Sequence, residues 1–321
     1  MSELDESRIL VKIAQMYYED EMNQSEISRK LGVHRTTVSR LLKQAREDGI
    51  VQIKINSDQN QFIKLERKLE VNFGLKEARV VRSSSGEKEE IIKQRLGQAG
   101  AGVLNRIIKN DITVGFAWGT TLAALANQLL DYDCKSASAI ITPLVGAPGD
   151  MKNEYHVNTI VSKVATAFNA KSRQLCVPAI TSAKDTKEAI IKDANIKQIL
   201  ELWNKLDIAV VGIGAPIKSS NMVWTGYFDN QEIECLTQKD AVGDIASRFY
   251  DINGEVIDSF LSERTIAIEL EKLRDLDYSI GIASSIEKVP SILGALRGGF
   301  INVLITDEIT ARQILEKDNE D

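Results

Sequence analysis

The stretch NQSEISRKLGVHRTTVSRLLKQAREDG, residues 23–49, decides the fold of the amino-terminal part of the chain. Asn23 is a good helix cap, and Glu26 follows three residues later, as in a capping box. The pattern therefore predicts a helix over residues 24–31. Gly32 ends this helix, because glycine tolerates the positive φ that a helix C-terminus often requires.

A second helix is predicted from about residue 35 to residue 48, and Gly49 ends it. Its apolar face consists of Val38, Leu41, Leu42 and Ala45. Two helices joined by a short glycine turn form the helix-turn-helix motif, whose second helix enters the major groove of DNA. His34 stands where Ser or Thr would cap this helix better, so the start of the helix is open. Alternatively, His34 itself contacts DNA.

The charge of this motif agrees with DNA binding. The whole chain has a net charge of −6, yet residues 27–46 contain six Lys or Arg and no Asp or Glu. A solvated basic surface is the alternative for any single residue, but spacing, turn and charge together favour DNA. The residues expected to contact phosphates or bases are Gln24, Ser25, Arg29, His34, Arg35, Thr36, Thr37, Ser39, Arg40 and Lys43.

Segments on either side complete a DNA-binding domain over residues 1–56. Residues 7–20 have apolar side chains at helical spacing and predict a first helix. The alternation in IVQIKIN, residues 50–56, predicts a strand or wing. Residues 57–74 predict a helix that either docks on its own domain or pairs with a second copy. We favour contact between copies, because helix-turn-helix proteins usually bind DNA as dimers.

Short apolar segments alternate with helical segments over residues 75–321, which predicts an α/β domain with a mostly parallel sheet. The expected strands are 78–83, 111–117, 138–146, 173–179, 207–214, 277–284 and 300–307. The expected helices are 87–109, 120–130, 154–169, 184–204, 287–297 and 308–317.

Ligands of such domains bind beyond the carboxyl ends of the strands. The segment GFAWGTT, residues 115–121, offers glycines, a helix N-terminus and two hydroxyls to an anion. A tight turn capped by Thr120 or Thr121 is the alternative. The further candidates follow later strands, and a plain turn or an internal ion-pair network would also explain them. The residues expected to bind an effector are Gly115, Trp118, Gly119, Thr120, Thr121, Gly214, Asp244, Arg248, Asp251 and Lys288.

Composition argues against several other functions. The chain has three well-separated Cys and two His, which are poor material for a disulfide framework or a zinc site. We find neither a Walker A loop nor a GxGxxG motif, so we expect no nucleotide cofactor. We find no apolar run of membrane-spanning length and no signal peptide, so we expect a cytoplasmic protein.

Several long motifs in the same order resemble the SorC family of sugar-sensing transcriptional regulators. They include residues 13–55 as well as GFAWGTTL, AVGDIASRFYDINGEVID and IGIASSIEKVPSILGALRGGFINVLITD. The resemblance implies an effector domain with a fold similar to ribose-5-phosphate isomerase and glucosamine-6-phosphate deaminase. It also implies a homotetramer built as a dimer of dimers, and a phosphorylated sugar effector for an operon of the sorbose or sorbitol type. In the family, the loop matching residues 115–121 cradles the effector phosphate, the region matching 244–251 lies near the sugar, and Lys288 matches a basic residue near the site.

Two other functions compete with a regulator. A sugar-phosphate isomerase or deaminase would need a placed general base, and no acid–base pair stands out. His156 is the one histidine outside the DNA-binding domain. A purely structural DNA-bending protein would not need the large α/β domain. We therefore expect a non-enzymatic regulator that binds operator DNA.

Overall fold

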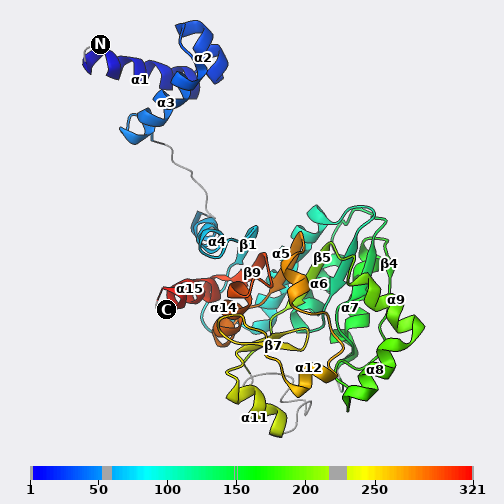
Figure 1. The fold of residues 1–321 in the computed structure, drawn as a ribbon. Helices are drawn as coiled ribbons and strands as arrows, with labels where there is room; N and C mark the ends of the chain where they lie inside the picture. Colours follow the sequence, from blue (N-terminus) through cyan, green and yellow to red (C-terminus); the bar gives the residue numbers. More distant parts are fainter. Residues whose placement is uncertain (1–2, 53–59, 148, 150, 217–229, 320–321) are drawn as a thin grey trace. The chain divides into compact units, whose positions relative to one another are not determined.

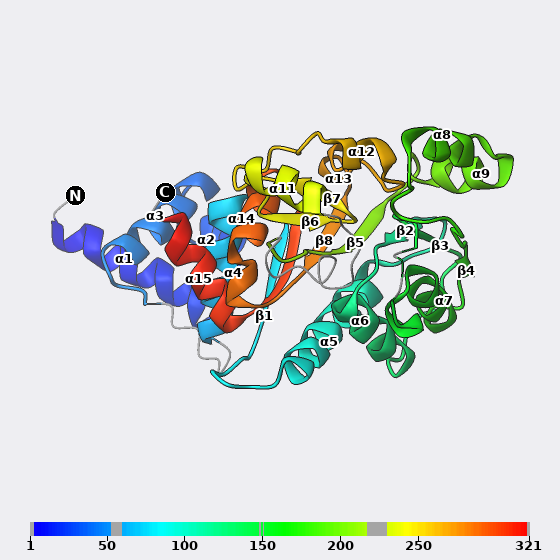
Figure 2. The same cartoon turned by 90° about the horizontal axis from the view of Figure 1, so that it is seen from below.

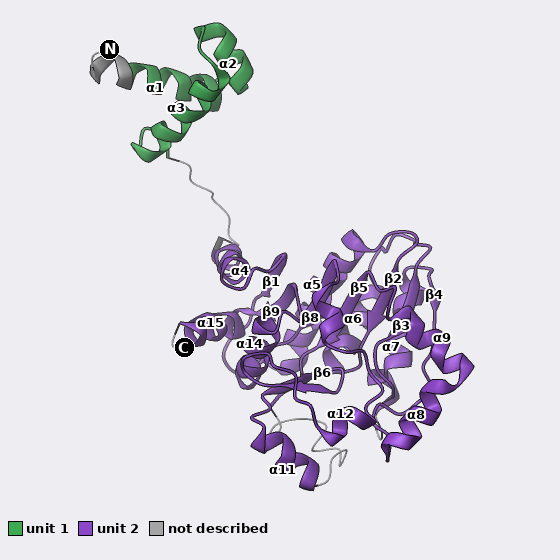
Figure 3. Ribbon diagram, in the orientation of Figure 1, with its two compact units in different colours: residues 1–60 green, residues 61–321 purple. Residues whose placement is uncertain are grey.

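The computed structural model describes residues 3–52, 60–147, 149, 151–216 and 230–319. It divides into two compact units, residues 1–60 and residues 61–321 (Figure 3). We describe each unit by itself. The boundary lies at the start of the predicted linker helix, so nearly all of that helix belongs to the second unit.

The first unit is a bundle of three helices (Figure 1). They are α1 (Glu3–Tyr18), α2 (Gln24–Leu31) and α3 (Arg35–Glu47). The predicted capping box is confirmed, since Asn23 accepts from the amides of Ser25 and Glu26 while Glu26 accepts from the Asn23 amide. Gly32 ends α2 with φ of 67°, as expected. One apolar cluster joins the three helices through Leu10, Ile13, Ala14, Met16, Ile27, Val38, Leu41, Leu42 and Ala45.

The residues after α3 do not begin the predicted strand. The amide of Val51 donates to the carbonyl of Ala45 at 3.0 Å, and Gly49 has φ of 72°. This hydrogen bond satisfies a carbonyl of the last helical turn, as in a Schellman motif. Residues 50–52 therefore belong to the turn that follows α3 and not to a strand, and this part of the strand prediction was wrong. The rest of the predicted wing, residues 53–56, lies outside the described residues.

The second unit is built on a seven-stranded sheet in the order β1-β9-β8-β5-β2-β3-β4, and all neighbouring strands are parallel. The strands are β1 (Glu77–Val81), β2 (Thr113–Phe116), β3 (Ile140–Pro143), β4 (Lys171–Ser172), β5 (Ile208–Gly212), β8 (Tyr278–Ile282) and β9 (Val303–Asp307). The predicted α/β class is confirmed. These strands are strongly apolar because helices cover both faces of the sheet.

Helices α5 (Glu89–Ile107), α6 (Thr120–Leu130) and α7 (Val157–Ala167) pack side by side on one face. Helices α14 (Val289–Arg297) and α15 (Glu308–Asp318) lie on the other face (Figure 2). The remaining helices are α8 (Lys184–Lys192), α9 (Ala194–Leu202), α11 (Asn230–Gln238), α12 (Phe260–Arg264), α13 (Glu271–Arg274) and the short 3-10 helices η1 (Asn153–Tyr155) and η3 (Ile286–Lys288).

Helix α4 (Asn60–Phe73) covers the open edge of this sheet at β1. The carboxylates of Glu66 and Glu70 accept hydrogen bonds from the backbone amides of Val80 and Ala78. Exposed strand edges invite pairing with other chains, and α4 satisfies this one. Two further residues of α4, Leu65 and Leu69, are buried in the core of the second unit. Helix α4 thus docks on its own domain, which was one of the two alternatives.

The predicted set of strands needs two corrections, one strand removed and one hairpin added. Residues 173–179 form no strand, although Leu175, Val177 and Ala179 are buried in alternation; β4 ends at Ser172. A hairpin of β6 (Gly243–Ile245) and β7 (Arg248–Tyr250) was not predicted. This antiparallel hairpin packs beside α14.

Candidate functional site

The predicted DNA-contacting side chains lie on the outer face of α2 and α3. Gln24 and Thr37 are half-buried, and the other eight residues of that set are exposed. His34 caps α3 through its backbone but makes no side-chain cap hydrogen bond, which leaves the imidazole free. Lys43 pairs with Glu47 at 3.5 Å, but exposed pairs of this kind are weak. Lys43 can therefore exchange Glu47 for a phosphate at low cost.

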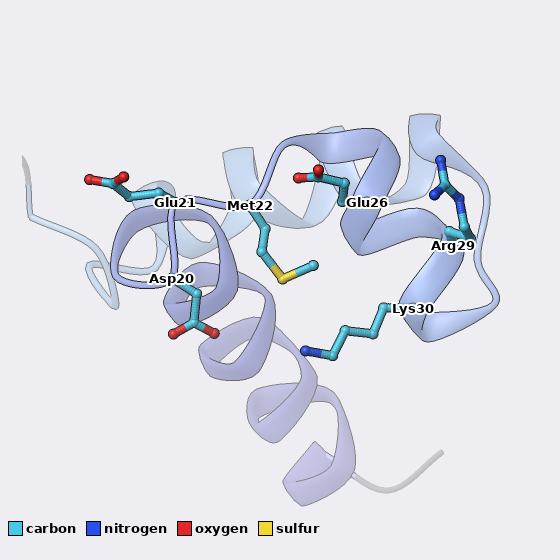
Figure 4. A pocket seen from close by; sticks show the side chains of 6 residues that line it. All are labelled: Asp20, Glu21, Met22, Glu26, Arg29 and Lys30. Carbon is cyan, nitrogen blue, oxygen red and sulfur yellow. The ribbon is translucent and has the colours of Figure 1, made fainter.

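A hollow between the end of α1 and α2 is lined by Asp20, Glu21, Met22, Glu26, Arg29 and Lys30 (Figure 4). Its carboxylates and cations are mixed, so it carries no clear signal for a small anion. A neighbouring hollow is lined by Tyr17, Asn23, Gln24, Ser25, Glu26, Arg29 and Arg35. Four of these residues were predicted to contact DNA. Their gathering around one concave surface suits contact with the nucleic-acid backbone.

The second candidate site follows from the strand order. The chain runs outward from β2 through β3 to β4, and outward in the opposite direction from β5 through β8 to β9. The order therefore reverses between the neighbouring strands β2 and β5. Ligands of open α/β sheets bind outside the carboxyl ends of the strands at such a reversal. Residues 117–121 and 213–216 follow these two strands directly.

The loop after β2 leads into the N-terminus of α6. Gly119 is the cap residue, with φ of 136° and no side-chain cap, so Thr120 and Thr121 lie within the first turn rather than capping it. Among the described residues, neither threonine hydroxyl has a hydrogen-bond partner. Because the first amides of a helix also lack partners within the helix, this turn presents several free donors to an anion.

Trp118 adds a buried donor to the same loop. Its indole Nε1 is buried and has no hydrogen-bond partner among the residues that the structure describes. Leaving such a donor unsatisfied costs about 1–3 kcal/mol, which a ligand oxygen could recover. Gly115, by contrast, lies inside β2, where a Cβ atom would come within 2.2 Å of Leu144 Cδ2. Packing inside the sheet therefore requires glycine here, and the expectation that it lets a ligand approach the backbone stays a prediction.

Asp244 and Lys288 lie together beside the loop after β5. The Gly214 amide donates to the Asp244 carbonyl at 2.8 Å, and Lys288 Nζ donates to the Ile213 carbonyl at 2.8 Å. A Cβ atom at Gly214 would come within 1.8 Å of Asp244 Oδ1, so only glycine fits there. The structure thus brings three predicted residues from separate parts of the sequence into one cluster.

Burial dominates the titration of this pair. It raises the pKa of Asp244 to about 6, although the Ser247 amide and the Lys288 charge act in the opposite direction. It lowers the pKa of Lys288, and the nearby Asp244 carboxylate opposes that shift. A buried carboxylate beside a half-buried amine at a sheet edge is typical of a functional site.

Arg248 and Asp251 are placed differently. The Arg248 guanidinium is buried, pairs with Glu269 at 2.6 Å and donates to the carbonyls of Ser262 and Ala267. Asp251 accepts from the amides of Asn253 and Glu255 within its own turn. The structure therefore favours the alternative of an internal network for these two residues over effector contact.

Two further observations bear on chemistry. His156 caps α7, because its Nδ1 accepts from the Asn158 amide at 3.3 Å, and this occupies the nitrogen that a general base would need. Within the described ranges, no cluster of three or more His, Cys, Asp or Glu could hold a metal ion. In the same ranges, no helix is both long and apolar enough to cross a membrane.

Ser247 belongs to this site but was not among the predicted residues. It is 2 % exposed, and its amide donates to Asp244 Oδ2 at 3.1 Å. The charged neighbours drew attention in the sequence, whereas an uncharged serine between Ala246 and Arg248 carried no signal of its own.

Comparison with known proteins identifies both units. Residues 57–316 match the family model described as "Putative sugar-binding domain", and residues 5–54 match the "Homeodomain-like domain". The chain is 42 % identical to the sorbitol operon regulator of Klebsiella pneumoniae, over 98 % of this chain and all of that protein. It is 34 % identical to the deoxyribonucleoside regulator of Bacillus subtilis, over 97 % of this chain and 98 % of that protein.

The fold is also that of a solved regulator. The crystal structure of the full-length sorbitol operon regulator SorC from Klebsiella pneumoniae matches with a TM-score of 0.75 at 41 % identity, covering 98 % of this chain and 99 % of that one. These relatives are transcriptional regulators and not enzymes, which confirms the expectation of a non-enzymatic protein. With a helix-turn-helix unit, a matching sugar-binding domain and similarity over nearly its full length, this chain belongs to the SorC family of sugar-binding transcriptional regulators.

Proposed function

We propose that this chain controls a sugar catabolic operon of the sorbose or sorbitol type in response to a phosphorylated sugar or polyol. The first unit binds operator DNA through α2 and α3. The second unit binds the effector at the carboxyl edge of the sheet. The chain acts in the cytoplasm as a homotetramer, a dimer of dimers. Similarity to the sorbitol operon regulator supports the choice of sugar class.

One observation carries this proposal: hydrogen-bond donors and a positive charge lie at the strand reversal together with a buried carboxylate. The first turn of α6, with Thr120 and Thr121, offers donors without partners, and the half-buried amine of Lys288 adds a positive charge. These groups suit a phosphate. The carboxylate of Asp244 repels a phosphate but accepts hydrogen bonds from sugar hydroxyls. A ligand with a phosphate at one end and hydroxyls along its carbon chain satisfies both sets.

Regulation requires that the effector bind one state of the protein more tightly than another. The effector can shift DNA binding only by that difference, which is about 1–3 kcal/mol in typical allosteric proteins. We infer that the effector and the operator prefer different arrangements of the tetramer. Whether the effector raises or lowers the affinity for DNA follows from which of these arrangements it prefers.

A thermal-shift screen tests the effector site. D-sorbitol 6-phosphate, D-sorbose 1-phosphate and D-fructose 6-phosphate are each titrated against the full chain, with sorbitol and inorganic phosphate as separate controls. A ligand that binds only the folded state raises Tm, and at a given ligand concentration the shift grows with the logarithm of the affinity. We expect at least one sugar phosphate to raise Tm more than either control.

Thr120→Val then tests the phosphate end of the site. The substitution keeps the shape of the side chain but removes one donor, so the Tm shift should decrease. Thr186→Val is the matched control, because Thr186 is an exposed threonine in the first turn of α8, away from the strand reversal. An equal Tm shift in wild type and Thr120→Val would contradict the assignment of this turn to phosphate.

The outer face of α4 supports association between copies. Ile63 is 48 % exposed and Val71 is 74 % exposed, although α4 is docked on its own domain through Leu65 and Leu69. Both side chains are therefore accessible to a second copy of the chain. Light scattering should give the mass of four 35.6 kDa chains. A monomeric mass would contradict the tetramer.

A further inference from the structure

The turn between β6 and β7 is built from residues that fit its backbone poorly. Ile245 pairs with Arg248, so Ala246 and Ser247 alone form the loop. Their φ angles are 52° and 65°, both in the left-handed region. Two-residue hairpin loops of this kind favour Asn-Gly, because a Cβ atom is strained at positive φ. Both positions here carry a Cβ atom.

The hydroxyl of Ser247 also lacks a hydrogen-bond partner among the described residues. The residue is only 2 % exposed. A buried hydroxyl without a partner destabilises the fold. For stability alone, glycine would be better at this position on both counts. Strain and an unsatisfied group at one residue point to a function rather than to folding.

The surroundings indicate what this hydroxyl binds. The Ser247 amide donates to Asp244 Oδ2 at 3.1 Å, so the turn holds the buried carboxylate next to Ser247. This carboxylate accepts hydrogen bonds from hydroxyl groups and repels a phosphate, so a ligand would place hydroxyl groups at this turn. A serine hydroxyl can donate and accept at once, as can each hydroxyl of a sugar or polyol. The Trp118 indole, from the loop after β2, packs against the apolar cluster that contains Phe249 and carries another buried donor without a partner among the described residues.

We propose that Ser247 is a ligand-binding residue, whose hydroxyl bonds to a hydroxyl group on the carbon chain of the effector. This assignment rests on the proposed function, because it places the polyol end of the sugar phosphate at the β6–β7 turn. The strain at Ser247 is then retained because glycine would remove the contact. Ala246 has the same backbone conformation but no polar side-chain atom, so it helps to form the turn and makes no side-chain hydrogen bond to the ligand.

Isothermal titration of the full chain with D-sorbitol 6-phosphate tests this role in four proteins. Ser247→Ala removes the hydroxyl and keeps the strain, whereas Ser247→Gly removes both. Ala246→Gly relaxes the same turn and keeps the hydroxyl. We expect both Ser247 variants to bind about tenfold more weakly, which is the loss of one ligand hydrogen bond. We expect Ala246→Gly to bind within about twofold of wild type.

Thermal melts without ligand give the second readout. Ser247→Gly should melt about 1–3 °C above Ser247→Ala, because only the former relieves the strained φ. A variant that is more stable and binds more weakly indicates a residue kept for ligand contact. Damage to the fold would instead lower both Tm and affinity.

The results separate this inference from the proposed function. If wild type binds D-sorbitol 6-phosphate and both Ser247 variants bind it equally well, the inference is wrong and the proposed function stands. If Ala246→Gly loses as much affinity as Ser247→Gly, the turn conformation matters and the hydroxyl does not, which also overturns the inference. If wild type binds none of the three sugar phosphates named above, the proposed function fails and the inference fails with it.

Discussion

The buried carboxylate of Asp244 should make the stability of the second unit depend on pH in a defined direction. Burial raises its pKa to about 6, against about 3.8 for an exposed carboxyl. The folded chain therefore holds this proton more tightly than the unfolded chain. The resulting stabilisation is complete below the unfolded pKa and is lost as pH rises through about 6.

The size of the effect follows from the shift. A difference of about two pKa units corresponds to about 3 kcal/mol of unfolding free energy. Asp244→Asn keeps an oxygen that can accept the Ser247 amide but cannot ionise. Relative to wild type, the variant should therefore gain up to about 3 kcal/mol between pH 4 and pH 7.5.

Urea unfolding followed by tryptophan fluorescence measures this gain. All three tryptophans, Trp118, Trp203 and Trp224, lie in the second unit, so the signal reports that unit alone. Asp251→Asn is the control, because it removes a carboxylate from the same segment that is only half-buried and lies in a turn. If the unfolding free energies of wild type and Asp244→Asn changed by the same amount across this pH range, the buried-carboxylate account would be refuted.

Three further predictions concern the DNA-binding unit and the backbone. Arg40→Ala should weaken binding to a DNA duplex that has been selected for affinity to the wild-type chain, by about 1–3 kcal/mol, and should reduce the salt dependence of that binding. Lys12→Ala, on the exposed face of α1, should change neither quantity. Equal affinities of wild type and Arg40→Ala in a gel-shift assay would contradict this prediction. Ile27→Ala should destabilise the first unit by about 2–5 kcal/mol, because Ile27 is fully buried. Circular dichroism should then show an unfolding transition at lower temperature than in wild type, whereas the transition followed by tryptophan fluorescence should not change. Gly254→Ala should lower Tm strongly, because φ is +80° and a Cβ atom would come within 2.2 Å of Gly298 N; a normal melting curve would show that this contact relaxes.

The first unit was predictable because its signals are local. Asn23 and Glu26 lie three residues apart, Gly32 ends α2 at the expected place, and Val38, Leu41, Leu42 and Ala45 are all buried as expected. The parallel sheet was predictable for a similar reason, since apolar segments of four or five residues between helices leave few alternatives.

The failures have physical causes as well. Residues 173–179 are buried in alternation, but the backbone there makes one isolated bridge, at Pro178, so alternation alone could not show a strand. The β6–β7 hairpin has strands of three residues and an Ala-Ser turn, without the Asn-Gly that marks such loops. Arg248 pairs with Glu269, which is 21 residues away in the sequence, and this partner was visible only in three dimensions.

Binding of a selected DNA duplex by the full chain, measured by fluorescence anisotropy with and without D-sorbitol 6-phosphate, tests the central claim most directly. We predict that the sugar phosphate changes the apparent Kd for DNA by about 5- to 150-fold in wild type, and that Thr120→Val needs a higher concentration for the same change. A wild-type chain that binds both the duplex and the sugar phosphate, yet shows the same Kd for DNA in either condition, would contradict the account.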